Sequence, residues 1–169
     1  MLIEQKQLSN TEYLLFFPNR LQIVGTFIAS KDIAPTNELL QNIFTAQLAD
    51  TLLLTADFLY IKSNSEESLS DLEMISLAEI DDFCSRPINL SAPTSNTIEK
   101  IELILKTIIA PFLQKDGGDI RLAKYSNEIV YVNFLGKCHG CPYAKKTLKE
   151  RVEKNLIKYL PEVKEVTLI

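Results

Sequence analysis

Short runs of hydrophobic residues in the first half of the chain have the pattern of β-strands. Four segments are rich in aromatic or branched residues and are bounded by turn formers: 13–17, 21–27, 51–55 and 58–62. Segments of this length and composition predict strands. Pro18 and Asn19 stand between the first two segments, and such a pair predicts a hairpin turn. Ala56 and Asp57 predict a tight connection between the last two.

Two other segments of the first half repeat hydrophobic residues with the period of a helix. After Pro35, with Thr36 as the expected N-cap, one helical face collects Leu39, Leu40, Ile43, Phe44 and Leu48. Ser70 and Glu73 have the spacing of a capping box, which predicts the start of a second helix. The hydrophobic residues that follow extend this helix to about Arg86.

The second half has a different order of elements. An N-cap at Asn96 and a hydrophobic face from Ile98 to Phe112 predict a helix, followed by a turn at residues 116–119. Strands are predicted at 120–125 and 129–135, a helix from Pro142 to residue 160, and a last strand at 163–169. The second domain is therefore predicted as α-β-β-α-β.

A change of charge marks the boundary between the halves. Residues 1–95 carry 5 basic and 13 acidic side chains, a net charge of −8, whereas residues 96–169 carry 13 and 9, a net charge of +4. Prolines and serines close to the same position predict a linker at 88–96. We therefore expect an α+β protein with two small mixed domains, an acidic one at 1–87 and a second one at 97–169.

The composition narrows the class of protein. Of the 169 residues, 46% are hydrophobic and 24% are charged, as in an ordinary globular protein. No hydrophobic run approaches the roughly 18 residues of a membrane helix, and the start lacks the features of a secretory signal. With only three cysteines, a disulfide framework is not expected. These observations predict a protein of a reducing compartment, and we expect a cytoplasmic one of bacterial type.

Candidate chemistry is concentrated at residues 136–142, where Cys138 and Cys141 stand two residues apart between a predicted strand and a predicted helix. Two thiols at this spacing can bind one metal ion or cluster edge together, or they can form a disulfide. Gly136 and Gly140 would let the backbone turn tightly around both sulfurs. Nearby positive charge favours the thiolate form; it comes from Lys137, Lys145 and Lys146.

The number of available ligands restricts the metal hypothesis. An iron–sulfur cluster usually takes four cysteine thiolates, and a closed zinc site takes four cysteine or histidine ligands. His139 is a candidate third ligand, but a lone histidine in a turn is more often exposed to solvent. Cys84 is far along the chain and is better explained as a small buried residue. Two chains that each give Cys138 and Cys141 would supply four thiolates, and such a shared cluster would be labile.

These residues resemble a known family. Residues 96–169 are similar to the C-terminal domain of the NifU-like (Nfu) iron–sulfur cluster scaffolds and carriers. The similarity rests on Asp116-Gly117-Gly118-Asp119, Gly136-x-Cys138-x-x-Cys141-Pro142, Thr147-Leu148-Lys149 and Leu160-Pro161-Glu162-Val163. Residues 11–86 resemble, more faintly, the N-terminal domain of the same family, through Phe17-Pro18 and residues 56–61.

The resemblance implies a homodimer that holds a labile 4Fe-4S cluster between paired Cys138 and Cys141 and transfers it to apo-proteins. A 2Fe-2S cluster is the alternative cargo. The implied partners are apo iron–sulfur recipient proteins and upstream cluster assembly proteins. No catalytic residue, nucleic acid or membrane is implied, so the chain is expected to be a carrier and not an enzyme.

Two other functions compete with this interpretation. A C-x-x-C between a strand and a helix is also typical of thiol–disulfide oxidoreductases, although the α-β-β-α-β order fits the thioredoxin fold poorly. The lysines of the last helix could line a nucleic-acid surface, but lysines opposite a hydrophobic face are usually only solvated. Asp116 and Asp119 could bind a metal, but the two glycines between them favour a turn in which Asp119 caps local N–H groups.

Overall fold

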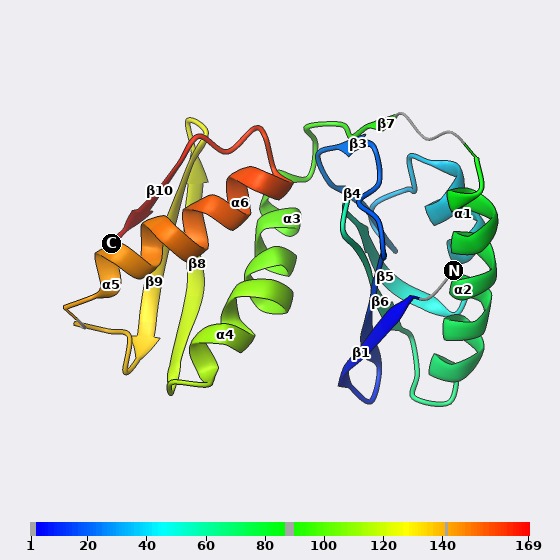
Figure 1. The fold of residues 1–169 in the computed structure, drawn as a ribbon, viewed down its shortest axis with the longest axis horizontal. Coiled ribbons are helices and arrows are strands. Elements are labelled where there is room, and N and C mark those ends of the chain that lie inside the picture. The colour runs from blue at the N-terminus through cyan, green and yellow to red at the C-terminus, as the bar shows by residue number, and fades with distance from the viewer. Residues whose placement is uncertain (1–2, 87–89, 141) are drawn as a thin grey trace. The chain divides into compact units, whose positions relative to one another are not determined.

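The computed structural model describes residues 3–86, 90–140 and 142–169. The chain divides into two compact units, Met1–Pro93 and Thr94–Ile169. Each unit combines helices with a β-sheet (Figure 1), which confirms the predicted α+β class. No helix among the described residues is long and hydrophobic enough to cross a membrane.

The first unit is built on a five-stranded antiparallel sheet with the strand order β1-β2-β6-β5-β4. Its strands are β1 (Glu4–Ser9), β2 (Glu12–Phe16), β4 (Phe27–Ser30), β5 (Ala49–Leu54) and β6 (Phe58–Ser63). Helices α1 (Glu38–Thr45) and α2 (Leu69–Cys84) pack on one face of the sheet (Figure 1). The core between them contains Leu15, Leu40, Ile43, Leu72 and Ile80, all essentially inaccessible to solvent.

The predicted hairpin between segments 13–17 and 21–27 is wrong. Strand β2 pairs with β1 and β6, while segment 21–27 contributes only the short β3 (Ile23–Val24) and the start of β4. Strand β3 pairs in parallel with β7 (Leu90–Ser91), so part of the predicted linker forms a strand. The sequence did not indicate β1 because most of its side chains are polar and exposed, as befits a strand at a sheet edge.

The two helix starts of the first unit differ from the predicted ones by one or two residues. Asn37, and not Thr36, caps α1, because its side-chain oxygen accepts a hydrogen bond from the N–H of Leu40 at 3.0 Å. Helix α2 begins at Leu69 with Ser68 at the N-cap position, ahead of the predicted capping box. The hydroxyl of Ser68 hydrogen-bonds to the hydroxyl of Ser65 at 2.8 Å, which ties the preceding turn to the helix.

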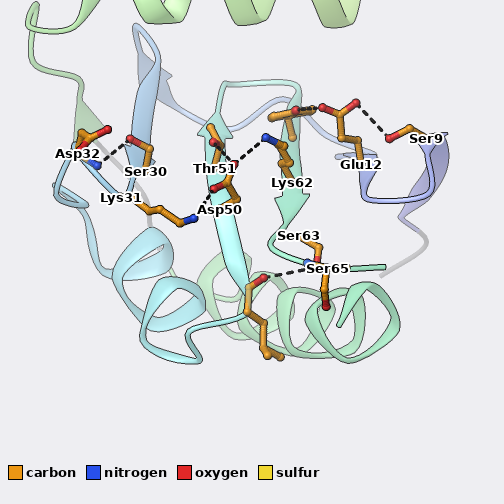
Figure 2. A network of polar contacts seen from close by, with 12 residues as sticks. Ser9, Glu12, Ser30, Lys31, Asp32, Asp50, Thr51, Lys62, Ser63 and Ser65 are labelled. Atoms are coloured by element: carbon orange, nitrogen blue, oxygen red, sulfur yellow. Dashed lines mark hydrogen bonds and ion pairs between the residues drawn. The ribbon is translucent and has the colours of Figure 1, made fainter. Parts of the chain in front are cut away.

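Polar side chains of the first sheet are largely paired within the unit (Figure 2). Asp50 forms ion pairs with Lys62 at 2.7 Å and with Lys31 at 3.2 Å. The hydrogen bond from Lys62 is the main reason why the pKa of Asp50 lies below its ordinary value. Glu12 accepts a hydrogen bond from the Tyr60 hydroxyl at 2.7 Å. These acidic side chains therefore have a structural role in the sheet.

The second unit is α-β-β-α-β, as predicted. A continuous helical segment, α3 (Thr97–Ile104), η1 (Leu105–Ile109) and α4 (Ala110–Gln114), precedes the hairpin of β8 (Gly118–Ser126) and β9 (Ile129–Gly136). A second helical segment, α5 (Ala144–Thr147), η2 (Leu148–Glu153) and α6 (Lys154–Tyr159), leads to β10 (Glu165–Leu168). The sheet order is β10-β9-β8, with β9 antiparallel to β8 and parallel to β10. The segments η1 and η2 are π-helical.

The hydrophobic pattern explains how this unit packs. In β9 the side chains of Val130, Val132 and Phe134 are buried, while the alternate residues are half-buried. Leu148, Val152 and Leu156 are buried along the last helical segment, as their spacing predicts. The helices therefore cover one face of the sheet. This packing fixes the position of the hairpin from which the loop after β9 begins.

Two details of the predicted helices are wrong. Ile98 is 49% exposed, because the buried face of α3 is formed by Thr97, Lys100, Ile101 and Ile104. Pro142 lies in a turn, and helix α5 begins at Ala144. The N–H of Thr147 donates to the carbonyl oxygen of Tyr143 at 2.9 Å, so Tyr143 takes the N-cap position, two residues later than in a helix that starts at Pro142.

Candidate functional site

The β8–β9 hairpin positions Cys138 through the backbone of the loop that follows β9. Gly118 and Gly136 are the paired residues at the open end of the hairpin. Beyond them, the N–H of Lys137 donates to the carbonyl oxygen of Gly117 at 3.0 Å, and the N–H of Cys138 donates to that of Leu135 at 3.3 Å. These two backbone hydrogen bonds, to Gly117 just before β8 and to Leu135 in β9, hold the half-buried Cys138 at the open end of the hairpin.

Gly118 provides the space for the thiol. A Cβ atom built on Gly118 would lie 2.1 Å from the Sγ of Cys138 and 3.0 Å from its Cβ. No real side chain fits at such distances. The backbone of Gly118 thus forms one wall of the site that Cys138 occupies.

Gly136 lies very close to the backbone of Gly117 at the same end of the hairpin. Its φ is +60°, in the left-handed region, and a Cβ there would lie 2.5 Å from the carbonyl oxygen of Gly117. That oxygen is the acceptor for Lys137, so it cannot move without loss of the hydrogen bond that closes the loop. Gly136 therefore permits both the turn out of β9 and the close contact with Gly117, which lies in the turn before β8.

A Gly136→Ala substitution is expected to destabilise the second unit. A left-handed φ costs an L-residue about 1–2 kcal/mol, and the collision with a backbone oxygen should bring the loss to about 3 kcal/mol. Chemical denaturation monitored by circular dichroism measures the change. Gly117→Ala is the matched control: its φ is also positive, at +77°, but its Cβ would meet the flexible Lys137 side chain at 3.2 Å, so a smaller loss is expected. Equal losses in the two variants would contradict this account.

The rest of the loop is open. His139 is exposed, as expected of a lone histidine in a turn, and a Cβ on Gly140, whose φ is +73°, would meet no atom within 4 Å. Cys141 lies outside the described residues, so its role as a ligand stays a prediction. No group of three or more potential metal ligands occurs among the residues that the structure describes.

Cys84 belongs to the first unit, at the end of α2. It is half-buried and packs against the core of that unit, in agreement with its interpretation as a small hydrophobic residue. Burial raises the pKa of the Cys84 thiol, and the negative charge of Asp81 raises it further. Both effects disfavour the thiolate that a metal would need.

The charged residues near the loop have local partners. Lys149 pairs with Glu153 at 2.6 Å, one turn further along the helix, and Lys146 lies 3.9 Å from Glu150. These pairs weaken the case for a nucleic-acid surface on this helix. The Asp119 carboxylate accepts a hydrogen bond from the N–H of Ile120 at 2.9 Å, which confirms the predicted capping role.

These features suit the binding of a soft metal centre. One cysteine thiol is held at the end of a rigid hairpin, beside a backbone wall without side chains and an open loop tip. Thiolates are the preferred ligands of iron–sulfur clusters, and a bulky inorganic group needs open space next to the sulfur. The described donors of one chain are too few for a complete cluster.

The fold and the loop define a class of protein with two α+β units, the second of which presents a C-x-x-C loop beyond a β-hairpin. Residues 101–167 match the NifU-like domain family. This match confirms the resemblance predicted from the motifs of the second half. Sequence comparison extends the likeness to nearly the whole chain.

The relatives found include mitochondrial proteins of plants and insects. The chain is 28% identical to "NifU-like protein 4, mitochondrial" of Arabidopsis thaliana over 184 residues, which cover 98% of this chain and 65% of that protein. It is 29% identical to "NFU1 iron-sulfur cluster scaffold homolog, mitochondrial" of Drosophila ananassae over 182 residues, which cover 98% of this chain and 63% of that protein. The chain thus spans about two-thirds of the length of these relatives.

The predicted cytoplasmic location is wrong. The relatives are named mitochondrial, which contradicts the expectation of a cytoplasmic protein of bacterial type. Targeting segments are removed from mature proteins, so the first residues of a sequence are a poor guide to the compartment.

Proposed function

We propose that this protein is an iron–sulfur cluster scaffold and carrier of mitochondria. The observation that carries the proposal is the position of Cys138, whose thiol lies against the backbone of Gly118 at the end of the hairpin in a NifU-like domain. The name of the insect relative, an iron–sulfur cluster scaffold homolog, supports the same cargo. In this role the cluster is a cargo that the protein binds and releases, and the protein is not an enzyme.

Cys138 and Cys141 are the proposed ligands, and two chains share one cluster. Each chain supplies two thiolates from one loop, whereas a cluster needs four. A homodimer therefore forms when the cluster binds, with 4Fe-4S as the first proposal and 2Fe-2S as the alternative. Because the cluster bridges two chains, its loss removes the link between them, and this lability suits transfer to apo iron–sulfur proteins.

The two units have different proposed roles. The NifU-like unit, predicted at 97–169, holds the cluster, and the unit predicted at 1–87, with 88–96 as its linker, is an Nfu-type N-terminal domain. The first half is acidic and the second half is basic. We expect the acidic unit to contribute to the recognition of recipient proteins, and the upstream partners to be proteins that assemble clusters.

Anaerobic reconstitution with iron and sulfide tests the proposal. The loaded protein should be brown, contain about four irons per dimer and sediment as a dimer, and removal of the iron by a chelator should reduce the dimer fraction. An apo form of a 4Fe-4S enzyme, added as acceptor, should recover its activity. A complete cluster on a monomer would contradict the shared site. A colourless protein that reduces insulin disulfides would instead favour the thiol–disulfide oxidoreductase.

A further inference from the structure

The first unit contains a polar cavity whose lining includes neither proposed cluster ligand. It has a volume of about 420 Å³ and lies between the β1–β2 hairpin and the start of α2. Its polar lining includes Gln5, Gln7, Asn10, Tyr13, Glu66 and Glu73, and neither lysine nor arginine lines it. The volume falls within the range of roughly 300–1,000 Å³ that is usual for small-ligand sites.

Tyr13 is the most informative residue of this lining. Its side chain is 4% exposed, and in the described part of the chain its hydroxyl has no hydrogen-bond partner. The nearby Ser76 hydroxyl donates its hydrogen to the carbonyl oxygen of Leu72 at 2.6 Å, so that hydrogen is not available to Tyr13. A buried hydroxyl without a partner is costly, so its retention calls for an explanation. Tyr13 pairs with Gln7 across β1 and β2, which places both side chains on the face that carries α2.

The two carboxylates that line the cavity, Glu66 and Glu73, have no lysine or arginine beside them in this lining. Glu73 is half-buried and close enough to Tyr13 for its charge to raise the pKa of that hydroxyl, in addition to the larger effect of burial. Within the described residues Glu73 forms no ion pair. Glu66 accepts one hydrogen bond, from the side-chain amide of Asn10 at 3.0 Å. The cavity therefore combines two carboxylates, amide oxygens and a neutral hydroxyl in one place.

We propose that this cavity binds an organic cation with a guanidinium or ammonium group. A half-buried carboxylate without a counter-ion favours a cation, and the Tyr13 hydroxyl and the glutamine side chains can accept its N–H groups. A guanidinium fits this set better than an ammonium because its planar fork can contact two acceptors at once. The cation is either an arginine side chain of a partner polypeptide or a free small molecule of the same chemistry.

Titration of the full chain tests the proposal, with N-acetyl-arginine amide as the probe and the corresponding citrulline derivative as its neutral counterpart. Calorimetry should detect the arginine probe, while the citrulline probe should bind at least tenfold more weakly. Glu73→Gln should weaken the arginine probe about tenfold. Glu67→Gln is the matched control, because Glu67 is an exposed acid next to Glu66 and outside the cavity lining, and its variant should change the affinity less than twofold.

A second variant separates binding from folding. Tyr13→Phe removes a hydroxyl without a partner, so its Tm should be unchanged or higher, while the affinity for the arginine probe should fall several-fold. A lower Tm with unchanged affinity would show a purely structural hydroxyl and overturn the proposal, as would equal binding of the arginine and citrulline probes. Absence of binding by the arginine probe at millimolar concentration would also overturn it.

Two further probes distinguish the sources of the cation. A Gly-Arg-Gly peptide that binds more tightly than agmatine would support a partner polypeptide, and the reverse order would support a small molecule. Neither proposed cluster ligand lines the cavity, so these titrations should give the same result with the apo protein and with the Cys138→Ser variant.

Discussion

A Cys138→Ser variant is expected to contain almost no iron after anaerobic reconstitution. In the proposed dimer the substitution removes two of the four thiolates, one from each chain. A serine hydroxyl remains protonated near neutral pH and is a poor ligand for iron in such a cluster. The remaining two thiolates, one from each chain, are half of what the cluster needs, so we expect at least a tenfold fall in iron per chain. Iron analysis and visible absorption spectra measure the loss.

Cys84→Ser is the matched control for this experiment. Cys84 is half-buried in the first unit, and burial raises the pKa of its thiol, so it should not contribute to the cluster. The Cys84→Ser variant should load iron to the level of the unmodified protein, and Cys141→Ser should behave like Cys138→Ser. Full iron content in Cys138→Ser, or its loss only in Cys84→Ser, would mean that the cluster ligands have been misassigned.

The second unit was predictable from its sequence because its pattern is regular. In β9 every second residue is buried, and Leu148, Val152 and Leu156 repeat at helical spacing, so each segment turns one defined face to the core. The first unit was less predictable, since the partner of β2 is set by long-range pairing with β6 and not by the turn at Pro18. The polar residues of β1 carry no hydrophobic pattern at all.

The chemistry of the candidate site was predictable from the sequence, but the contact between Gly118 and the Cys138 thiol was not. The spacing of Cys138 and Cys141 indicates thiolate chemistry from the sequence alone. Gly118 precedes Cys138 by twenty positions, and the sequence offers a turn as a sufficient reason for its presence. Only the register of β8 and β9 brings the Gly118 backbone against the thiol. One signal for this contact was available in the Gly117-Gly118 pair. Gly118 lies in a strand, where glycine is normally unfavourable unless another group comes close to the backbone.

Gly118→Ala is therefore expected to weaken cluster binding without a change of any ligand. The φ of Gly118 is not in the left-handed region, so alanine is compatible with the backbone there. The added Cβ would, however, lie 2.1 Å from the Sγ of Cys138 and displace the thiol. Because supporting residues of a metal site typically affect affinity by about 10–100-fold, we expect a fall on the order of tenfold. Competition with an iron chelator during reconstitution measures the difference.

Gly140→Ala separates this effect from a general intolerance of the loop to alanine. At Gly140 the backbone is strained by a φ of +73°, but the added Cβ would meet no atom within 4 Å. The two variants thus exchange the two costs: Gly118→Ala collides with the thiol without backbone strain, and Gly140→Ala strains the backbone without a collision. If the position of the Cys138 thiol controls cluster retention, Gly118→Ala must lose the cluster at a lower chelator concentration than Gly140→Ala. The opposite order would mean that the conformation of the loop tip, and not the wall formed by Gly118, limits binding.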